Sequence, residues 1–283
     1  MTKFKYFFGS DERSVHFLNT IYKNNENIKI VTLQPSKQGR GRKVKPNKVE
    51  LFALKNNIEY TYYSENSVYE DMDYGIVASF SKIFSDNFIK KNKNLYNIHL
   101  SILPELRGPT PVENTILKNF DFAGYTIFQI NQGIDTGKIL YQFKFKVNTE
   151  IYASEIYKYI YYHFENQYNL INFNSNLKNQ NAQGSLTFKF SKSDFNITGQ
   201  TLADAKRKIR AFDAIGPAYI IYKNKFLKIH NYFLDEITPG IELIDGIIYP
   251  NEVTPEGKKR MNFHDYTRGL KWLFQQVFKQ QIN

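Results

Sequence analysis

The stretch that decides the fold is Asn-Ile-His-Leu-Ser-Ile-Leu-Pro-Glu-Leu-Arg-Gly, residues 97–108. Apolar and aromatic residues precede it, and Pro104 and the closing glycine then interrupt regular backbone. This pattern predicts a buried strand that runs into a loop. Alternate residues of a strand point the same way, so Asn97 and His99 are expected to lie side by side where the chain leaves the sheet. In open α/β sheets this carboxyl end of a strand is where ligands bind.

A second stretch, Gln-Gly-Ile-Asp-Thr-Gly at 132–137, places Asp135 between two glycines. Such a setting favours a tight turn that holds the carboxylate and lets other backbone approach. An asparagine, a histidine and an aspartate brought together have the groups to stabilise an oxyanion, move a proton and orient an imidazole. The alternative interpretation is structural, because a strand histidine is often simply buried and satisfied by its neighbours.

The longer strings carry more information. Asn97-Ile-His99, Ser101-Ile-Leu-Pro104, Arg107-Gly108 and Pro111 follow one another, and Tyr125–Ile139 contains Asp135. In this order and spacing they resemble the two signature motifs of the formyltransferases that use 10-formyltetrahydrofolate. The resemblance implies formyl transfer, with Asn97, His99 and Asp135 as catalytic residues and 10-formyltetrahydrofolate as co-substrate. No metal is expected, because the chain has no cysteine and its five histidines are scattered.

Composition sets the outer limits. The chain has 283 residues and a formal net charge of +11, which favours an anionic partner such as nucleic acid or a phosphorylated or polyglutamylated small molecule. A lysine-rich composition without any role is the alternative. The absence of cysteine excludes disulfides and thiolate nucleophiles and fits a reducing compartment, so a cytoplasmic location is predicted. No apolar run approaches the ~20 residues of a membrane span.

Residues 34–48 form a basic stretch that is broken by glycine and proline. The glycines oppose a helix and the cations have affinity for phosphate, although a solvated loop is the usual outcome of such a run. The stretch resembles the Gly-Arg-Gly-Lys loop of the methionyl-tRNA formyltransferases, which enters the tRNA acceptor arm. This resemblance implies a tRNA-binding role for Arg40, Arg42 and Lys43.

The resemblance also implies where the folate lies. The loop after the strand predicted at 73–78 holds the pterin ring in this family, so Ser79, Phe80 and Ile83 are expected to contact it, although such apolar residues are often plain core. The loop after the decisive strand is expected to contribute Ser101, Leu103 and Pro104. By contrast His163, which lies on the apolar stripe of the helix predicted at 154–170, is interpreted as a packing residue.

The predicted fold class is α/β, with a Rossmann-like formyltransferase domain at 1–172, a linker rich in Asn and Gln at 173–185, and a C-terminal domain at 186–283. Short strands in the last segment predict a small oligonucleotide-binding (OB) type of barrel. The barrel is expected to be shortened, because 239–248 is briefer than the corresponding strands of the family. The helix predicted at 201–212 carries Lys206, Arg207 and Arg210 on one face, and the resemblance implies that they bind tRNA.

The predicted function is therefore transfer of a formyl group to the α-amino group of initiator Met-tRNA by a monomeric enzyme. A sugar N-formyltransferase that acts on a nucleotide-linked amino sugar is the alternative. It would share the catalytic residues but would not need the basic loop or the basic second domain. A catalytically silent RNA-binding protein and a hydrolase that releases formate remain as further hypotheses.

Overall fold

A computed structural model describes residues 3–24, 27–38 and 43–270 of the chain. The chain forms two compact units that are interleaved in sequence. The first unit contains Met1–Pro111, Phe122–Lys146 and Tyr157–Thr187, and the second contains Val112–Asp121, Val147–Ile156 and Phe188–Asn283. The segment 173–185, predicted to be a linker, thus falls within the first unit.

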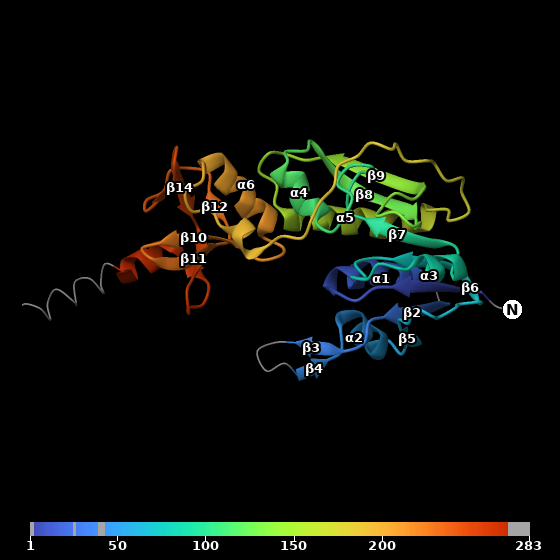
Figure 1. Ribbon diagram of the computed structural model, residues 1–283. Helices are drawn as coiled ribbons and strands as arrows, with labels where there is room; N and C mark the ends of the chain where they lie inside the picture. The colour runs from blue at the N-terminus through green and yellow to red at the C-terminus, as the bar shows by residue number, and fades with distance from the viewer. Residues whose placement is uncertain (1–2, 25–26, 39–42, 271–283) are drawn as a thin grey trace, which may run out of the picture. The chain divides into compact units, whose positions relative to one another are not determined.

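The first unit is built on a seven-stranded sheet of order β5-β2-β1-β6-β7-β8-β9. Its strands are β1 (Phe4–Phe8), β2 (Ile28–Thr32), β5 (Tyr60–Tyr62), β6 (Met72–Val77), β7 (Leu95–His99), β8 (Phe122–Gln129) and β9 (Ile139–Lys146). The five strands from β5 to β7 in this order are parallel, whereas β8 and β9 are antiparallel. The parallel part predicted from the alternation of short apolar segments and helices is confirmed (Figure 1).

Helices connect the strands: α1 (Glu12–Asn24), α2 (Lys48–Lys55), α3 (Asp86–Lys91), α4 (Pro111–Leu117), α5 (Ala153–Gln167) and the short 3₁₀ turn η1 (Tyr168–Leu170). Their starts follow from local chemistry. Asn47 caps α2 by accepting from the backbone N–H groups of Val49 and Glu50, and Ser85 caps α3 by accepting from that of Phe88. Each cap satisfies N–H groups that a helix leaves without partners in its first turn.

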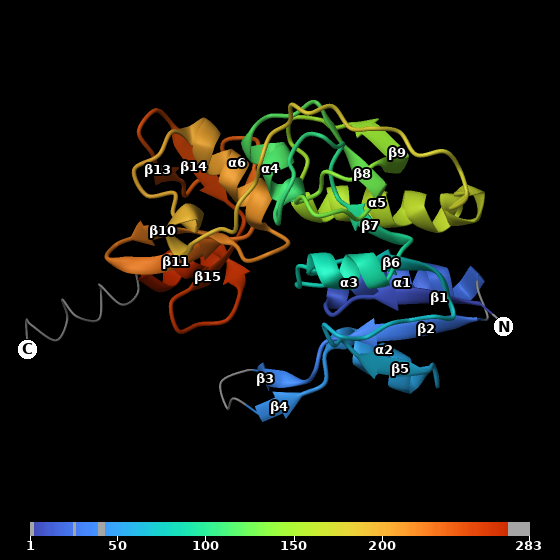
Figure 2. The ribbon, with the colours of Figure 1, turned by 45° about the vertical axis from the view of Figure 1, so that its right-hand side comes forward.

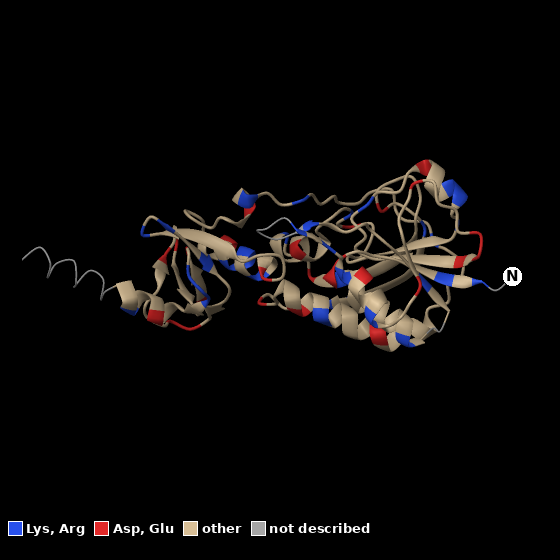
Figure 3. Cartoon of the chain, turned by 90° about the horizontal axis from the view of Figure 1, so that it is seen from below, with Lys and Arg blue, Asp and Glu red and all other residues tan. Residues whose placement is uncertain are grey.

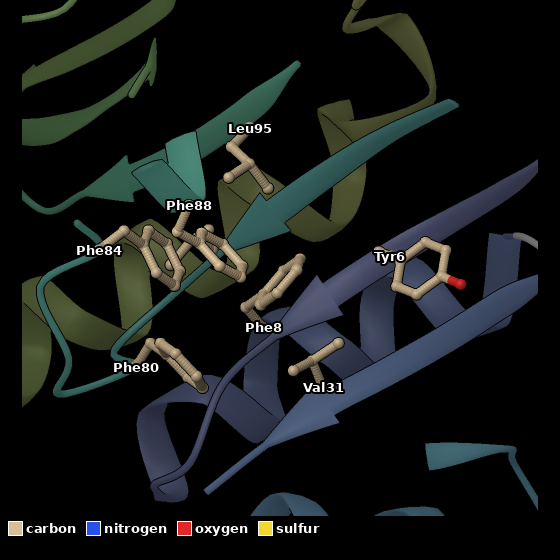
Figure 4. Packing of buried hydrophobic residues seen from close by; sticks show 8 residues of the cluster. Tyr6, Phe8, Val31, Phe80, Phe84, Phe88 and Leu95 are labelled. Carbon is tan, nitrogen blue, oxygen red and sulfur yellow. The ribbon is translucent and has the colours of Figure 1, made fainter. Parts of the chain in front are cut away.

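An aromatic cluster fills the core on the α3 side of the sheet. It joins Phe8 of β1 to Phe84 and Phe88, and Figure 4 shows these rings facing one another. The rings of Phe84 and Phe88 stack with centroids 4.8 Å apart, while Phe8 meets both edge-on. These are the offset and edge-to-face arrangements that the aromatic quadrupole favours.

Within its described residues, the basic stretch at 34–48 contains two paired strands, called the hairpin below, where the sequence predicts a loop. Strand β3 (Ser36–Gln38) pairs antiparallel with β4 (Lys43–Lys45), and the two form a sheet of their own. Figure 2 shows this hairpin set apart from the main sheet, beyond β2 and α2. The described side chains of β4 are exposed. The pairing was not predicted because it depends on a cross-strand register that the Lys- and Gly-rich pattern does not encode.

Besides most of α4 and the start of α5, the described part of the second unit contains one further α-helix and short strands. Its elements are η2 (Lys192–Phe195), α6 (Leu202–Phe212), β10 (Ala218–Tyr222), β11 (Lys225–Ile229), β12 (Tyr232–Phe233), β13 (Ile241–Glu242), β14 (Ile247–Pro250), β15 (Glu252–Pro255) and β16 (Met261–Asn262). They make a four-stranded sheet, β10-β11-β15-β16, and a three-stranded sheet, β12-β14-β13. The small C-terminal β region is therefore confirmed. Among the described residues 186–190 there is no strand, and an isolated bridge pairs Leu186 with Arg107.

Replacing Phe88 by alanine tests the aromatic core. The side chain is fully buried, so Phe88→Ala is expected to lower the free energy of unfolding by about 3–5 kcal/mol. Ile83→Ala is the matched control, because Ile83 lies five residues earlier and is 83 % exposed, and its change is expected to stay within about 0.5 kcal/mol. Urea denaturation of both variants measures the difference, and equal losses would contradict this packing.

Candidate active site

His99 stands at the carboxyl end of β7 and is almost fully buried. Its Nε2 lies 2.8 Å from the carbonyl oxygen of Leu106. A carbonyl only accepts hydrogen bonds, so Nε2 carries the proton in this contact. The other ring nitrogen, Nδ1, faces the Asp135 carboxylate with Oδ2 3.5 Å away. The imidazole is therefore held between a backbone carbonyl and a carboxylate, both from other parts of the chain.

Asp135 reaches His99 from the turn between β8 and β9. Its backbone is left-handed, with φ 53°, a region that aspartate tolerates better than most residues. The Oδ2 atom that faces the imidazole also accepts a hydrogen bond of 2.8 Å from the backbone N–H of Gly108. The carboxylate thus joins the loop after β7 to the β8–β9 turn, which brings together the two stretches singled out in the sequence.

Asn97 lies two residues before His99 in β7, so both side chains leave the same face of the sheet. It is only partly buried. Within the described part of the chain its amide makes no hydrogen bond, in contrast to His99 and Asp135. A neutral amide donor without a protein partner therefore stands next to a histidine–aspartate pair at the carboxyl edge of the sheet. This arrangement suits acyl-type transfer, in which a carbonyl oxygen gains negative charge.

The model of the formyl transferase family matches residues 7–169, more than half of the chain. The chain belongs to the formyl transferase family. It is 31 % identical over 247 residues to a methionyl-tRNA formyltransferase from Thermosipho africanus, a match that covers 83 % of this chain and 81 % of the relative. A second one, from Thermosipho melanesiensis, is 27 % identical over 290 residues and covers 92 % and 93 %. The resemblance seen in the sequence is thereby confirmed, and the protein is a formyl-transferring enzyme.

Solved structures of this fold include sugar enzymes. The N-formyltransferase from Helicobacter canadensis, solved with folinic acid and dTDP-3-aminofucose, aligns with a TM-score of 0.63 at 22 % identity, covering 88 % of this chain and 99 % of that one. A sugar 3N-formyl transferase solved with dTDP and 5-N-formyl-THF aligns with a TM-score of 0.62 at 25 % identity, covering 92 % and 100 %. Formyl-tetrahydrofolate is accordingly the formyl donor associated with the family.

The folate-contact predictions concern two loops of the enzyme. In the loop after β6, Ser79 offers its carbonyl to the hydroxyls of Ser10 and Ser14. The structure places Phe80 differently from the expected ligand wall, since it is 3 % exposed and packs edge-on against Phe8 in the aromatic core. Ile83, in contrast, is open to solvent. Of the three contacts predicted in this loop, Ile83 is exposed, Ser79 is partly exposed and Phe80 is buried.

The loop after β7 is held tightly from β8 and β9. The hydroxyl of Thr126 donates to the carbonyl of Ser101 and accepts from the N–H of Leu103, and Gln142 donates to Leu103 as well. Ser101 and Leu103 are buried, whereas Pro104 is partly exposed. The Ser101 hydroxyl already donates to the carbonyl of Glu105. Of the three predicted contacts, Pro104 is thus the one with exposed surface.

The predicted tRNA-binding residues fall into two groups. Arg40 and Arg42 lie outside the described residues, and Lys43 begins β4 with an exposed side chain. On α6, Arg207 is paired with Asp204, and Lys206 lies over the Tyr232 ring, 5.3 Å from its centroid.

The burial of Arg210 contradicts the prediction that its side chain lies on an exposed basic face of α6. It is buried, and its Nη1 donates to Glu150 and to the Tyr232 hydroxyl, each at 2.8 Å. The helical period places it beside the apolar stripe, and the long guanidinium reaches a carboxylate that the sequence pattern does not reveal. In Figure 3, basic and acidic residues are interspersed along the described ribbon.

Two residues of the site were not predicted. Arg107 is buried and donates from its guanidinium to Gln180, whose amide in turn donates to the Asp135 turn. Arg107 is part of the first motif, but nothing in its pattern indicates a partner 73 residues away. Gln180 lies in a segment of linker-like composition, where no local signal marks it.

His163 behaves as predicted. Its ring stacks on Phe143 of β9 with centroids 3.3 Å apart, and burial lowers its pKa, so it packs as a neutral ring. Among the described ranges no group of three or more His, Cys, Asp or Glu side chains is placed to hold a metal ion. No helix in the described part of the chain is long and apolar enough to cross a bilayer.

Replacing Gly108 by alanine tests how the loop reaches Asp135. Gly108 has φ 107°, and a Cβ there would stand 2.5 Å from the carbonyl oxygen of Thr187. Gly108→Ala is therefore expected to displace the N–H that holds Asp135 and to lower both the melting temperature and turnover. Gly199→Ala is the control, because Gly199 also has a positive φ but nothing near its Cβ, and it should cost only about 1–2 kcal/mol of stability with turnover unchanged. Normal turnover in Gly108→Ala would contradict this reading.

Proposed function

We propose that the enzyme transfers the formyl group of 10-formyltetrahydrofolate to the α-amino group of initiator methionyl-tRNA. The observation that carries the chemistry is the placement of Asn97 beside the His99–Asp135 pair. The acceptor is argued separately, from the relatives and from the basic hairpin.

In this proposal the unpartnered Asn97 amide receives the formyl oxygen. When the acceptor nitrogen attacks the formyl carbon, that oxygen gains negative charge, and an N–H donor already in place stabilises it. One such donor is worth roughly 3 kcal/mol in the transition state. Because Asn97 has no competing partner in the described structure, no protein contact has to break before it acts.

Asp135 is proposed to accept the proton that the attacking amine loses. The new bond joins the acceptor nitrogen to the formyl carbon, the bond from that carbon to N10 of the folate breaks, and a proton ends on N10. Both nitrogens of His99 already face an oxygen, so His99 orients Asp135 in this arrangement. His99 can donate a hydrogen bond to the formyl oxygen only if it first gives up its contact with Leu106 or with Asp135.

The relatives support tRNA as the acceptor. The two quoted methionyl-tRNA formyltransferases align over most of their own length and of this chain, including its C-terminal part. The net charge of +11 and the exposed Lys43 and Lys45 of the hairpin suit a phosphate-bearing partner.

A sugar N-formyltransferase is the second candidate, and two observations favour it. The solved structures described above include sugar enzymes of nearly the same length as this chain. In addition, the predicted tRNA-binding cations of α6 already have partners, and Arg210 is buried. A nucleotide-linked amino sugar needs neither those cations nor the hairpin.

The deciding experiment offers both acceptors. The purified enzyme is incubated with 10-formyltetrahydrofolate and either charged initiator tRNA or amino-sugar nucleotides, and the formylated product is identified. Formyl-methionyl-tRNA is expected. Asp135→Asn and His99→Ala are expected to abolish transfer to either acceptor while the circular dichroism spectrum stays unchanged. Turnover near normal in these variants would refute the site, and formylation of the sugar alone would refute the acceptor.

The hairpin has its own test. Lys43→Ala is expected to weaken use of tRNA and to reduce the dependence of log KM for tRNA on log salt by about one, because one phosphate contact is lost. The KM for the formyl donor should not change. Lys146→Ala is the control for the loss of one positive charge. Lys146 is exposed on β9, the edge strand at the other end of the seven-stranded sheet from β5. Equal effects of the two variants would contradict a specific contact.

A further inference from the structure

The segment 178–187 runs directly along the active-site loops of the first unit. Lys178 exchanges two backbone hydrogen bonds with Ile139 at the start of β9. Further on, the Ser185 hydroxyl accepts from the N–H of Leu106, and the N–H of Thr187 donates to the carbonyl of Arg107. A stretch with the composition of a linker is thus fastened to both catalytic loops.

Gln180 is the residue of this segment that touches the Asp135 turn. Its Nε2 donates to the carbonyl oxygens of Asp135 at 2.9 Å and Gly137 at 2.7 Å. Its Oε1 accepts from two atoms of the Arg107 guanidinium, Nη2 at 2.9 Å and Nε at 3.3 Å. Both amide protons and the amide oxygen are therefore used, and the side chain has one orientation in which all contacts are satisfied.

Arg107 stabilises this orientation of the Gln180 amide. The guanidinium is buried, and its remaining contact is the carbonyl of Asn181 at 3.1 Å. A buried cation requires acceptors around it, so rotation of the Gln180 amide would leave a charge facing N–H groups. The cation also polarises the amide and strengthens the bonds that its N–H groups donate.

The turn that Gln180 holds needs external support. Asp135 is left-handed, a backbone state that persists where the surroundings determine it. In this conformation its carboxylate reaches His99 and Gly108, and Gln180 holds the carbonyls of Asp135 and Gly137, the residues on either side of Thr136. We propose that Gln180, oriented by Arg107, is a positioning residue for Asp135. This inference rests on the proposed catalytic role of Asp135.

Gln180→Glu separates positioning from packing. The glutamate keeps the size of the side chain and pairs with Arg107, but it replaces the donor with an oxygen that faces two carbonyl oxygens. The turn that carries Asp135 is expected to shift. Because a small displacement of a catalytic group slows the reaction strongly, kcat is expected to fall about 10- to 100-fold. The KM values and the melting temperature should stay near those of the native enzyme.

Two further variants and a reference complete the test. Gln180→Ala, which also leaves Arg107 with fewer acceptors, is expected to lower kcat and the melting temperature together. Gln183→Ala changes the same residue type at an exposed position three residues on, and it should behave as the native enzyme. Asp135→Asn is assayed in parallel. If Asp135→Asn keeps turnover, the proposed site itself fails. If Asp135→Asn is inactive but Gln180→Glu keeps its kcat, only the positioning role is overturned.

Discussion

One carboxylate oxygen, Oδ2 of Asp135, holds the candidate active site together. It faces the imidazole of His99 while accepting the backbone N–H of Gly108. That oxygen therefore connects the end of β7, the loop that follows it and the turn between β8 and β9. A carboxylate is suited to this position because it accepts several hydrogen bonds at once.

The sheet makes this meeting possible. Parallel strands end at one edge, so the loops after β1, β6 and β7 gather there. Strand β8 runs antiparallel to β7 and ends opposite its start, and Asp135 in the segment that follows β8 nevertheless reaches the His99 imidazole. The aromatic cluster around Phe8 and Phe88 gives that edge a rigid base. The hydroxyls of Ser10 and Ser14 then tie the loop after β6 to the loop after β1.

Motifs with a local physical cause were predicted correctly. The buried strand at residues 97–99, the helices near 154–170 and 201–212 and the Asn97–His99 alternation follow from the periods of 3.6 and 2. The β3–β4 pairing and the place of Phe80 were missed, because each depends on a partner distant in sequence. Arg210 shows the same limit, since its burial becomes possible only where Glu150 and Tyr232 supply acceptors.

The sequence by itself determined the fold class, the family and the three candidate catalytic residues, because short motifs and the spacing of the hydrophobic residues indicate them. Only the tertiary structure decided which groups surround them. A linker-like glutamine reaches the Asp135 turn, and a buried arginine orients it, through contacts that span 43 to 73 residues. Such contacts form when loops from separate elements close together, and no local pattern records that closure.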